Sequence, residues 1–165
     1  LTAAIAIKRG LQRRGVPVTE VYVPPEGVTH LVVVGVEHGG SQVARLVLDF
    51  ITARRVMVSK VIVVDRDTDV FDMNQVIHAF STKCHPGRGI ILEHYEGRGN
   101  ALTPCYSADE RRRLKGTSAV FDATWPEEWE EETTPVKSPF ETTYPDSLRA
   151  KVLDNWRSYG LGEKT

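Results

Sequence analysis

The sequence predicts a mixed α/β domain followed by a C-terminal helix on an extended arm. Residues 60–64 form a β-branched run that ends in aspartates, which is typical of a strand buried on both faces. Strands and helices also alternate from residue 29 to residue 92, and this alternation predicts two parallel βαβ crossovers. An extended segment ahead of them predicts an antiparallel hairpin, so the sheet should be mixed.

The front of the chain is expected to be a helix followed by the hairpin. Residues 1–14 place apolar side chains on one face, and Gly15 can close the helix. Because this helix has neither an initiator Met nor an N-cap, we expect it to be the end of a longer helix. Residues 17–23 are extended, residues 24–27 form a Pro-rich turn, and residues 29–36 are strongly β-branched, which predicts paired strands.

The middle of the chain supplies the two crossovers. A helix over residues 42–54 follows a Gly-Gly-Ser turn that can cap it, and its apolar side chains share one face. A strand over residues 57–64 comes next. Asp72 can cap the following helix, and Gln75 completes a pair that resembles a capping box. A short strand over residues 89–92 ends the series.

The last forty residues differ from the rest. Residues 126–143 are rich in Glu, Thr and Pro, which is typical of a solvated linker. A helix is then expected from Tyr144 to about Tyr159, with Pro145 in its first turn and Gly160 just past its end. Its apolar face must be buried on its own core or on a neighbouring subunit, and the sequence leaves both open.

Composition excludes several partners. The 165 residues carry a net charge of -1, so neither nucleic acid nor an anionic membrane would find a strong basic field. No apolar run is long enough for a membrane span. Cys84 and Cys105 do not make a disulfide framework, so a reducing, cytoplasmic location is expected.

The sequence contains only weak candidates for a self-contained active site. The aspartate-rich loop after residue 64 lies where open α/β sheets place their working surface, yet it lacks the Gly and the closing Glu of a calcium loop. Cys84 and His85 are adjacent but do not match zinc-ligand spacing. Residues 111–113 are basic beside Asp109 and Glu110, which favours a mixed-charge surface. We therefore predict neither a metal site nor catalytic residues in this chain.

Three segments carry a family resemblance. Residues 60–72, residues 79–87 (Ala-Phe-Ser-Thr-Lys-Cys-His-Pro-Gly) and residues 144–156 resemble the UbiD family of decarboxylases, which use prenylated FMN, and in particular the fungal ferulic (cinnamic) acid decarboxylases. The resemblance covers nearly the whole chain in order and matches only the C-terminal third of such enzymes. It implies reversible decarboxylation of an aromatic or α,β-unsaturated acid by the parent protein.

The resemblance also implies that two domains of the parent protein have different roles. In the family, an N-terminal domain holds the prenylated FMN, a divalent metal ion such as Mn, potassium and a Glu–Arg–Glu catalytic network. A long helix joins it to a C-terminal domain that mediates dimerisation and walls part of the substrate pocket. Residues 1–15 would be the end of that helix, residues 16–125 the C-terminal domain, and residues 126–165 the arm and terminal helix. No cofactor is then expected in this segment, and the isolated segment should be inactive.

A few positions of the substrate pocket carry over by resemblance. Val56 and Met57 stand where the family's pocket-lining residues precede a strand, and Leu102 matches a Leu-x-Pro segment of the wall. Asn100 or Ala101 replaces an aromatic residue of the ferulic enzymes, and Val56-Met57 replaces a Tyr-Thr pair. The substrate is therefore expected to differ from cinnamate, and Asn100 would favour a hydroxylated or heteroaromatic acid.

A basic family residue near the end of the second helix reaches the cofactor phosphate, and Arg54 or Arg55 would take its place here. Two alternatives stay open on the sequence alone. One is a free-standing module for small-molecule binding or dimerisation. The other is a small hydrolase or metal enzyme that uses Cys84 and His85.

Overall fold

The computed structural model describes residues 2–54, 57–99, 101–126, 128–130, 132–136, 138 and 140–160. It divides into two compact units, Leu1–Trp129 and Glu130–Thr165. The elements of the first unit, in chain order, are α1 (Thr2–Gln12), β1 (Val18–Tyr22), the 3₁₀ turn η1 (Pro25–Gly27), β2 (Leu31–Val36), α2 (Ser41–Thr52), β3 (Lys60–Asp65), α3 (Met73–Lys83), β4 (Ile90–Tyr95), α4 (Ala108–Arg113) and β5 (Gly116–Ala123). The second unit contains α5 (Phe140–Thr143) and α6 (Asp146–Asp154).

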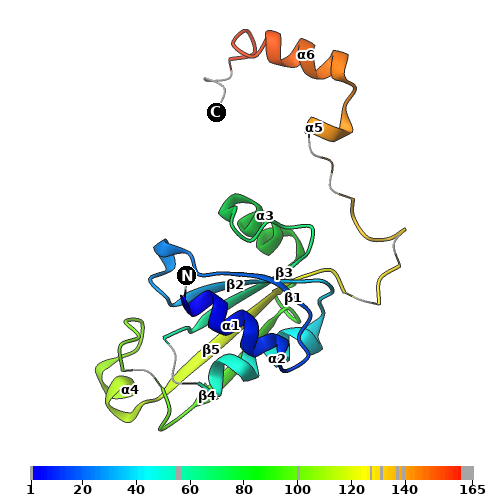
Figure 1. The fold of residues 1–165 in the computed structure, drawn as a ribbon. Coiled ribbons are helices and arrows are strands. Elements are labelled where there is room, and N and C mark those ends of the chain that lie inside the picture. The colour runs from blue at the N-terminus through cyan, green and yellow to red at the C-terminus, as the bar shows by residue number, and fades with distance from the viewer. Residues whose placement is uncertain are drawn as a thin grey trace. The chain divides into compact units, whose positions relative to one another are not determined.

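The first unit is built on a five-stranded sheet in the order β1-β2-β3-β5-β4 (Figure 1). β1 is antiparallel to β2, β2 and β5 are parallel to β3, and β4 is antiparallel to β5. In the centre, Lys60 of β3 lies opposite Leu31 of β2 and Ala119 of β5. The predicted mixed sheet with its front hairpin is therefore confirmed.

The second crossover differs in detail from the expected one. The chain leaves β3 through α3, but the predicted strand after residue 89 is β4, which runs along the edge, and β5 takes the parallel position beside β3. The burial patterns explain the exchange. β4 alternates exposed and half-buried side chains, as suits an antiparallel edge strand, whereas Val120 and Ala123 of β5 are buried.

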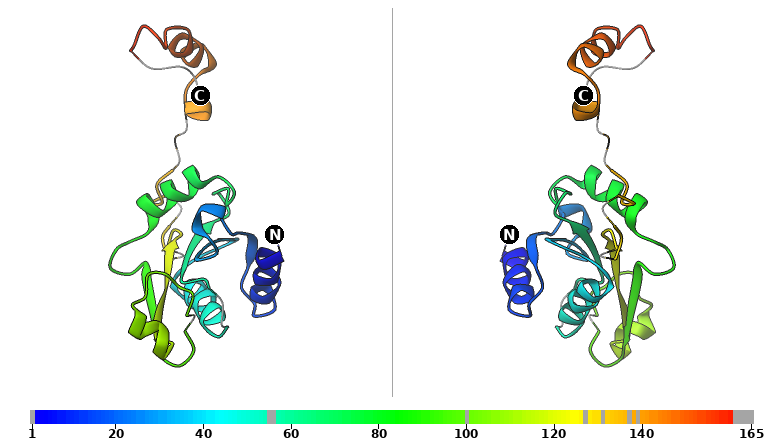
Figure 2. Two further views of the ribbon diagram at one scale, coloured as in Figure 1. Left: turned by 90° about the vertical axis from the view of Figure 1, so that its left-hand side faces the viewer. Right: turned by 90° about the vertical axis from the view of Figure 1, so that its right-hand side faces the viewer.

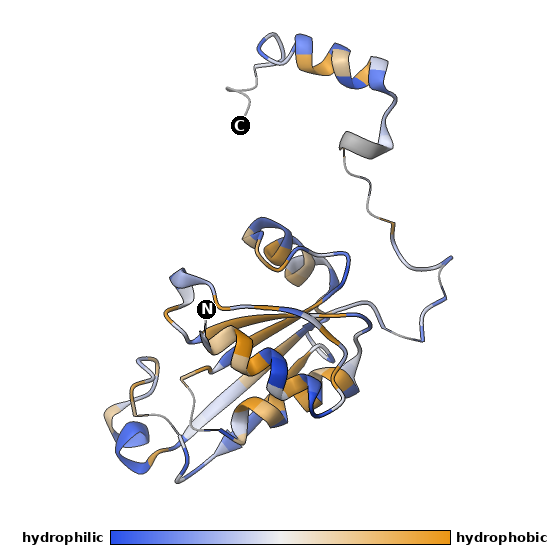
Figure 3. Cartoon of the chain, in the orientation of Figure 1, coloured by the Kyte–Doolittle hydropathy of each residue, from blue (hydrophilic) through white to orange (hydrophobic). Residues whose placement is uncertain are grey.

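Helices cover both faces of the sheet (Figure 2). α1 and α2 pack on one face, where their buried side chains join those of β2 and β3 in the larger core cluster. α3 packs on the other face through Val76 and Ala79. The valines of β2 and β3 point to both clusters, which is why these two strands form the hydrophobic centre of Figure 3. Because β2 and β3 are buried on both faces, they form the core of the sheet and hold its two edges in place.

Phe50 anchors α2 to α1. Its side chain is fully buried, and Gly10 of α1 makes room for it, because a Cβ at Gly10 would lie 2.3 Å from Phe50 Cζ. The C-terminal ends of the two helices are therefore held together at one aromatic ring. The predicted Asp72 cap of α3 is confirmed, since its carboxylate accepts a hydrogen bond from Asn74 N at 2.9 Å. Gln75 does not complete a capping box, because its Oε1 accepts from Asp69 N at 3.2 Å.

α6 is preceded by Pro145, as expected, and its residues Leu148 and Leu153 remain 43% and 38% exposed. The Nε1 atom of Trp156 is buried, yet it finds no hydrogen-bond acceptor among the described residues. None of the helices in the described ranges is both long and apolar enough to cross a membrane.

Candidate functional site

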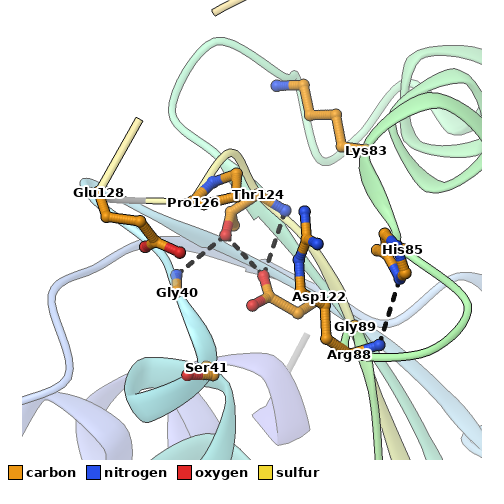
Figure 4. Close-up of a pocket in the computed structure, with 10 residues that line it drawn as sticks. All are labelled: Gly40, Ser41, Lys83, His85, Arg88, Gly89, Asp122, Thr124, Pro126 and Glu128. Atoms are coloured by element: carbon orange, nitrogen blue, oxygen red, sulfur yellow. Dashed lines mark hydrogen bonds between the residues drawn. The ribbon is translucent and has the colours of Figure 1, made fainter. Parts of the chain in front are cut away.

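The parallel strands β2, β3 and β5 end at one edge of the sheet, and a hollow of about 130 Å³ lies at this edge (Figure 4). We call it the carboxyl-edge hollow. Its lining includes the start of α2, the end of α3, and residues at and beyond the end of β5. The residues that line it include Gly40, Lys83, His85, Arg88, Asp122 and Thr124.

Lys83 is the buried cation of this edge. Only 2% of its side chain is exposed, and its Nζ donates to Asp65 Oδ2 at 2.9 Å and to Asp67 Oδ1 at 3.0 Å. The same Nζ lies 5.3 Å from the centroid of the Trp125 ring, and Trp125 N donates to Asp65 Oδ2 at 3.0 Å. The charge of Lys83 is therefore satisfied inside the protein, and the group serves the fold rather than a reaction.

Asp122 and Thr124 tie β5 to the start of α2. Thr124 Oγ1 donates to Asp122 Oδ1 at 2.6 Å and accepts from Gly40 N at 2.9 Å (Figure 4). Gly39 makes this approach possible, because a Cβ there would lie 2.1 Å from Thr124 Oγ1. The first turn of α2 is thus fixed by the end of β5.

Burial raises the pKa of the Asp122 carboxyl above its ordinary value of 3.8; hydrogen bonds from Thr124 oppose the rise, and the charge of Asp65 adds to it. The folded state therefore holds this proton more tightly than the unfolded chain does. From pH 3.8 up to the raised pKa, the contribution of Asp122 to stability falls as the pH rises.

Replacing Asp122 with Asn should remove this pH dependence, because Asn keeps the acceptor oxygen but does not ionise. Relative to the original protein, the free energy of unfolding of the variant should increase as the pH rises from about 4 to about 7. Urea unfolding at several pH values measures it. Asp69→Asn is the control, since Asp69 is an exposed carboxylate that accepts from Phe71 N. Equal pH profiles for both variants would contradict the prediction.

Cys84 and His85 do not form a reactive pair. Cys84 Sγ lies 3.6 Å from the Gly89 carbonyl oxygen, and burial first, then the charge of Asp122, raises the pKa of the thiol, which disfavours a thiolate. His85 Nδ1 accepts from the backbone N–H groups of Gly87 and Arg88 at 3.0 and 3.3 Å. These contacts shape the turn between α3 and β4.

Of the residues implied by the resemblance, Met57 and Leu102 lie at the opposite, amino edge of the sheet. Met57 precedes β3, and its carbonyl oxygen lies 2.8 Å from His30 Nδ1, just ahead of β2. Leu102 lies in the connection from β4 to β5, at the end of the sheet where β5 begins, and is 71% exposed. Arg55, Val56 and Asn100 lie outside the described residues.

Arg54 is exposed at the end of α2, and its Cζ lies 4.3 Å from the centroid of the buried Phe50 ring. It has no ion-pair partner among the described residues. A guanidinium group that is held in place and lacks a carboxylate partner is well suited to bind a phosphate group. Arg54 therefore fits the phosphate of a flavin mononucleotide by its chemistry.

A hydroxyl cluster marks the same edge. Tyr106 Oη donates to the Thr117 carbonyl oxygen at 2.6 Å and accepts from Thr117 N at 3.0 Å, while Tyr95 Oη lies 3.2 Å from Ser118 Oγ. Burial, followed by the hydrogen bond with Tyr95, raises the pKa of Tyr106, so its phenol stays protonated. The cluster fixes the chain segment that carries Leu102 and α4.

Several of these features escape sequence reasoning. A lysine at a helix end is usually exposed, so the burial of Lys83 gives no local signal. The tyrosines come together only because β4 pairs with β5. The run of aspartates at and after the end of β3 is the one sequence signal for the Lys83 cluster. Asp72 caps α3 as expected. Asp65 and Asp67 instead form ion pairs with Lys83.

Comparison with known proteins gives a family and its relatives. Residues 1–123 match the UbiD_C family model, described as the 3-octaprenyl-4-hydroxybenzoate carboxy-lyase C-terminal domain. Pyrrole-2-carboxylic acid decarboxylase of Pseudomonas aeruginosa is 29% identical over 110 residues, which are 65% of this chain and 21% of that protein. Ferulic acid decarboxylase 1 of Saccharomyces cerevisiae is 25% identical over 157 residues, or 88% of this chain and 31% of that protein. The chain thus spans less than a third of either relative.

Solved structures share the fold. The UbiD-class enzyme HmfF from Pelotomaculum thermopropionicum, in complex with FMN, superposes with a TM-score of 0.66 at 25% identity, over 87% of this chain and 32% of that one. The closed form of vanillic acid decarboxylase from Sedimentibacter hydroxybenzoicus gives a TM-score of 0.64 at 22% identity, over 96% of this chain and 32% of that one.

Proposed function

The chain belongs to the UbiD C-terminal domain family, and on this basis we propose that it walls the substrate pocket of a prenylated-FMN-dependent decarboxylase. The substrate would be an aromatic or α,β-unsaturated carboxylic acid, and the reaction would be reversible. One observation carries the proposal: the family match covers residues 1–123, which include the sheet and both of its edges. The two curated relatives are themselves decarboxylases of unsaturated acids.

The reactive groups would lie in another domain of the same protein. We assign the prenylated FMN, the divalent metal ion and the potassium ion to an N-terminal flavin-binding domain, which residues 1–15 would join to residues 16–125. Prenylated FMN would supply the centre at which the carboxyl group is lost as CO₂. Support comes from the fraction of each relative that this chain spans, 21% and 31%, which leaves room for that domain.

This chain would bind the acid substrate and exclude water from the pocket. Val56, Met57, Asn100 and Leu102 are proposed to face the planar acid, and a mainly apolar wall would destabilise its carboxylate relative to the departing CO₂. Arg54, with Arg55, is proposed to bind the cofactor phosphate. For Arg54 this rests on its exposed guanidinium, stacked on Phe50 and free of carboxylate partners among the described residues.

The proposal includes a homodimer. The apolar residues of α6 remain exposed within their own unit, and the buried Nε1 of Trp156 lacks an acceptor in the described chain. The exposed Leu148 and Leu153 would be buried if the terminal helix packs on a second copy.

A panel of acids tests the proposed reaction. The full-length protein, loaded with prenylated FMN, should release CO₂ from at least one of pyrrole-2-carboxylate, cinnamate, ferulate and vanillate. Loss of the carboxyl group is followed by chromatography of the products. A flavin-loaded protein that converts none of these acids, and incorporates no labelled CO₂ into their decarboxylated products, would contradict the proposal.

A further inference from the structure

The C-terminal ends of α1 and α2 hold two guanidinium groups against one ring. Arg14 Cζ lies 5.1 Å and Arg54 Cζ lies 4.3 Å from the centroid of the Phe50 ring. Phe50 is fully buried, whereas both arginines are exposed. The ring therefore acts as a fixed platform that orders two charged groups at the protein surface.

Gly10 of α1 leaves room for the Phe50 ring and for the Arg54 guanidinium beside it. A Cβ at Gly10 would lie 2.3 Å from Phe50 Cζ and 3.4 Å from Arg54 Nη2, so the Arg54 guanidinium lies directly over this position. Arg14 lies in the turn that follows α1, where its backbone N–H donates to the Leu11 carbonyl oxygen at 2.9 Å. Arg14 and Arg54 thus contact the same ring although they follow different helices.

Their charge is not neutralised by the protein. The chain contains no Asp or Glu before Glu20, and Glu20 forms its ion pair with Lys8, at 2.9 Å. Neither Arg14 nor Arg54 has an ion-pair partner among the described residues. The helix dipole stabilises one cation at each helix end, but it gives no reason for two like charges to share a ring. Two planar donor groups without a carboxylate are suited to a phosphate group.

We propose that Arg14 acts with Arg54 as a two-guanidinium clamp on the phosphate monoester of the flavin. This inference rests on the proposed function, which assigns Arg54 alone to the phosphate; the new element is Arg14, on the helix that would lead from the flavin-binding domain. A charged hydrogen bond contributes roughly a factor of ten in affinity, so each arginine has a measurable share.

The affinity of the full-length protein for FMN and for riboflavin tests the clamp, because riboflavin lacks the phosphate. Quenching of flavin fluorescence measures both. Arg14→Gln should weaken FMN binding by about tenfold and leave riboflavin binding unchanged. Arg14→Lys keeps the charge but loses the planar fork, so its effect should be intermediate. Arg13→Gln is the matched control, since it removes the same charge from the same helix end without touching the Phe50 ring, and FMN affinity should change by less than about twofold.

Each other outcome is decisive. If Arg14→Gln and Arg13→Gln weaken FMN binding equally, the clamp is wrong and the proposed function stands, because the unaltered protein still binds FMN. If Arg14→Gln lowers only the thermal unfolding midpoint and leaves FMN affinity intact, the stacking serves the fold and the clamp is again wrong. If the unaltered full-length protein binds neither flavin, the proposed function fails and the clamp fails with it.

Discussion

Removal of residues 144–165 is expected to convert the assembled protein from dimers into monomers or aggregates. The reason is the exposure of the apolar side chains Leu148 and Leu153 on α6. A helix face of this kind gains stability only by packing on another surface, and loss of that packing exposes the surface it covered. Light scattering coupled to size-exclusion chromatography measures the mass.

Point substitutions sharpen the truncation experiment. Leu148→Asp and Leu153→Asp should each weaken the dimer, because a carboxylate would be buried in the proposed interface. Lys151→Asp is the matched control, since Lys151 is an exposed polar residue of the same helix. An unchanged mass after truncation, or equal effects of all three substitutions, would remove α6 from the dimer interface.

Replacing Lys83 with Met is expected to lower the free energy of unfolding by about 3 kcal/mol. The Lys83 side chain is 2% exposed and that of Asp65 is 17% exposed, so the substitution leaves a largely buried carboxylate without its cation. Asp67, 43% exposed, is more easily solvated and should contribute less. Urea unfolding followed by circular dichroism measures the loss.

Two further variants separate the charge effect from packing. Lys60→Met, at an exposed lysine of β3, should change the free energy of unfolding by less than about 0.5 kcal/mol. Adding Asp65→Asn and Asp67→Asn to Lys83→Met should recover part of the loss, because no uncompensated charge remains. A loss below about 1 kcal/mol for Lys83→Met would show that water reaches Asp65 freely.

The centre of the fold could be predicted from sequence because its signals are local. The β-branched runs that became β2 and β3, the apolar face of α2 and the Asp72 cap each follow from adjacent residues. β5 was missed because its sequence, Gly-Thr-Ser-Ala-Val-Phe-Asp-Ala, is only weakly apolar, and its strand state depends on pairing with β3 and β4.

The site could be predicted only in part, because its features join distant segments. Lys83 binds Asp65 across 18 residues, and Arg14 and Arg54 each contact the Phe50 ring of α2. No local sequence pattern predicts such contacts, and a buried lysine is an exception because charged side chains are usually exposed. The pocket residues came from family resemblance, and they remain predictions.

The most direct measurement compares the chain alone with the chain joined to a flavin-binding domain. If the account is correct, residues 1–165 purified alone are colourless and release no CO₂ from any acid in the panel, whereas the joined protein shows a flavin spectrum and decarboxylates at least one of them. A flavin-coloured, active preparation of residues 1–165 alone would contradict the claim that the reactive groups lie on other polypeptide.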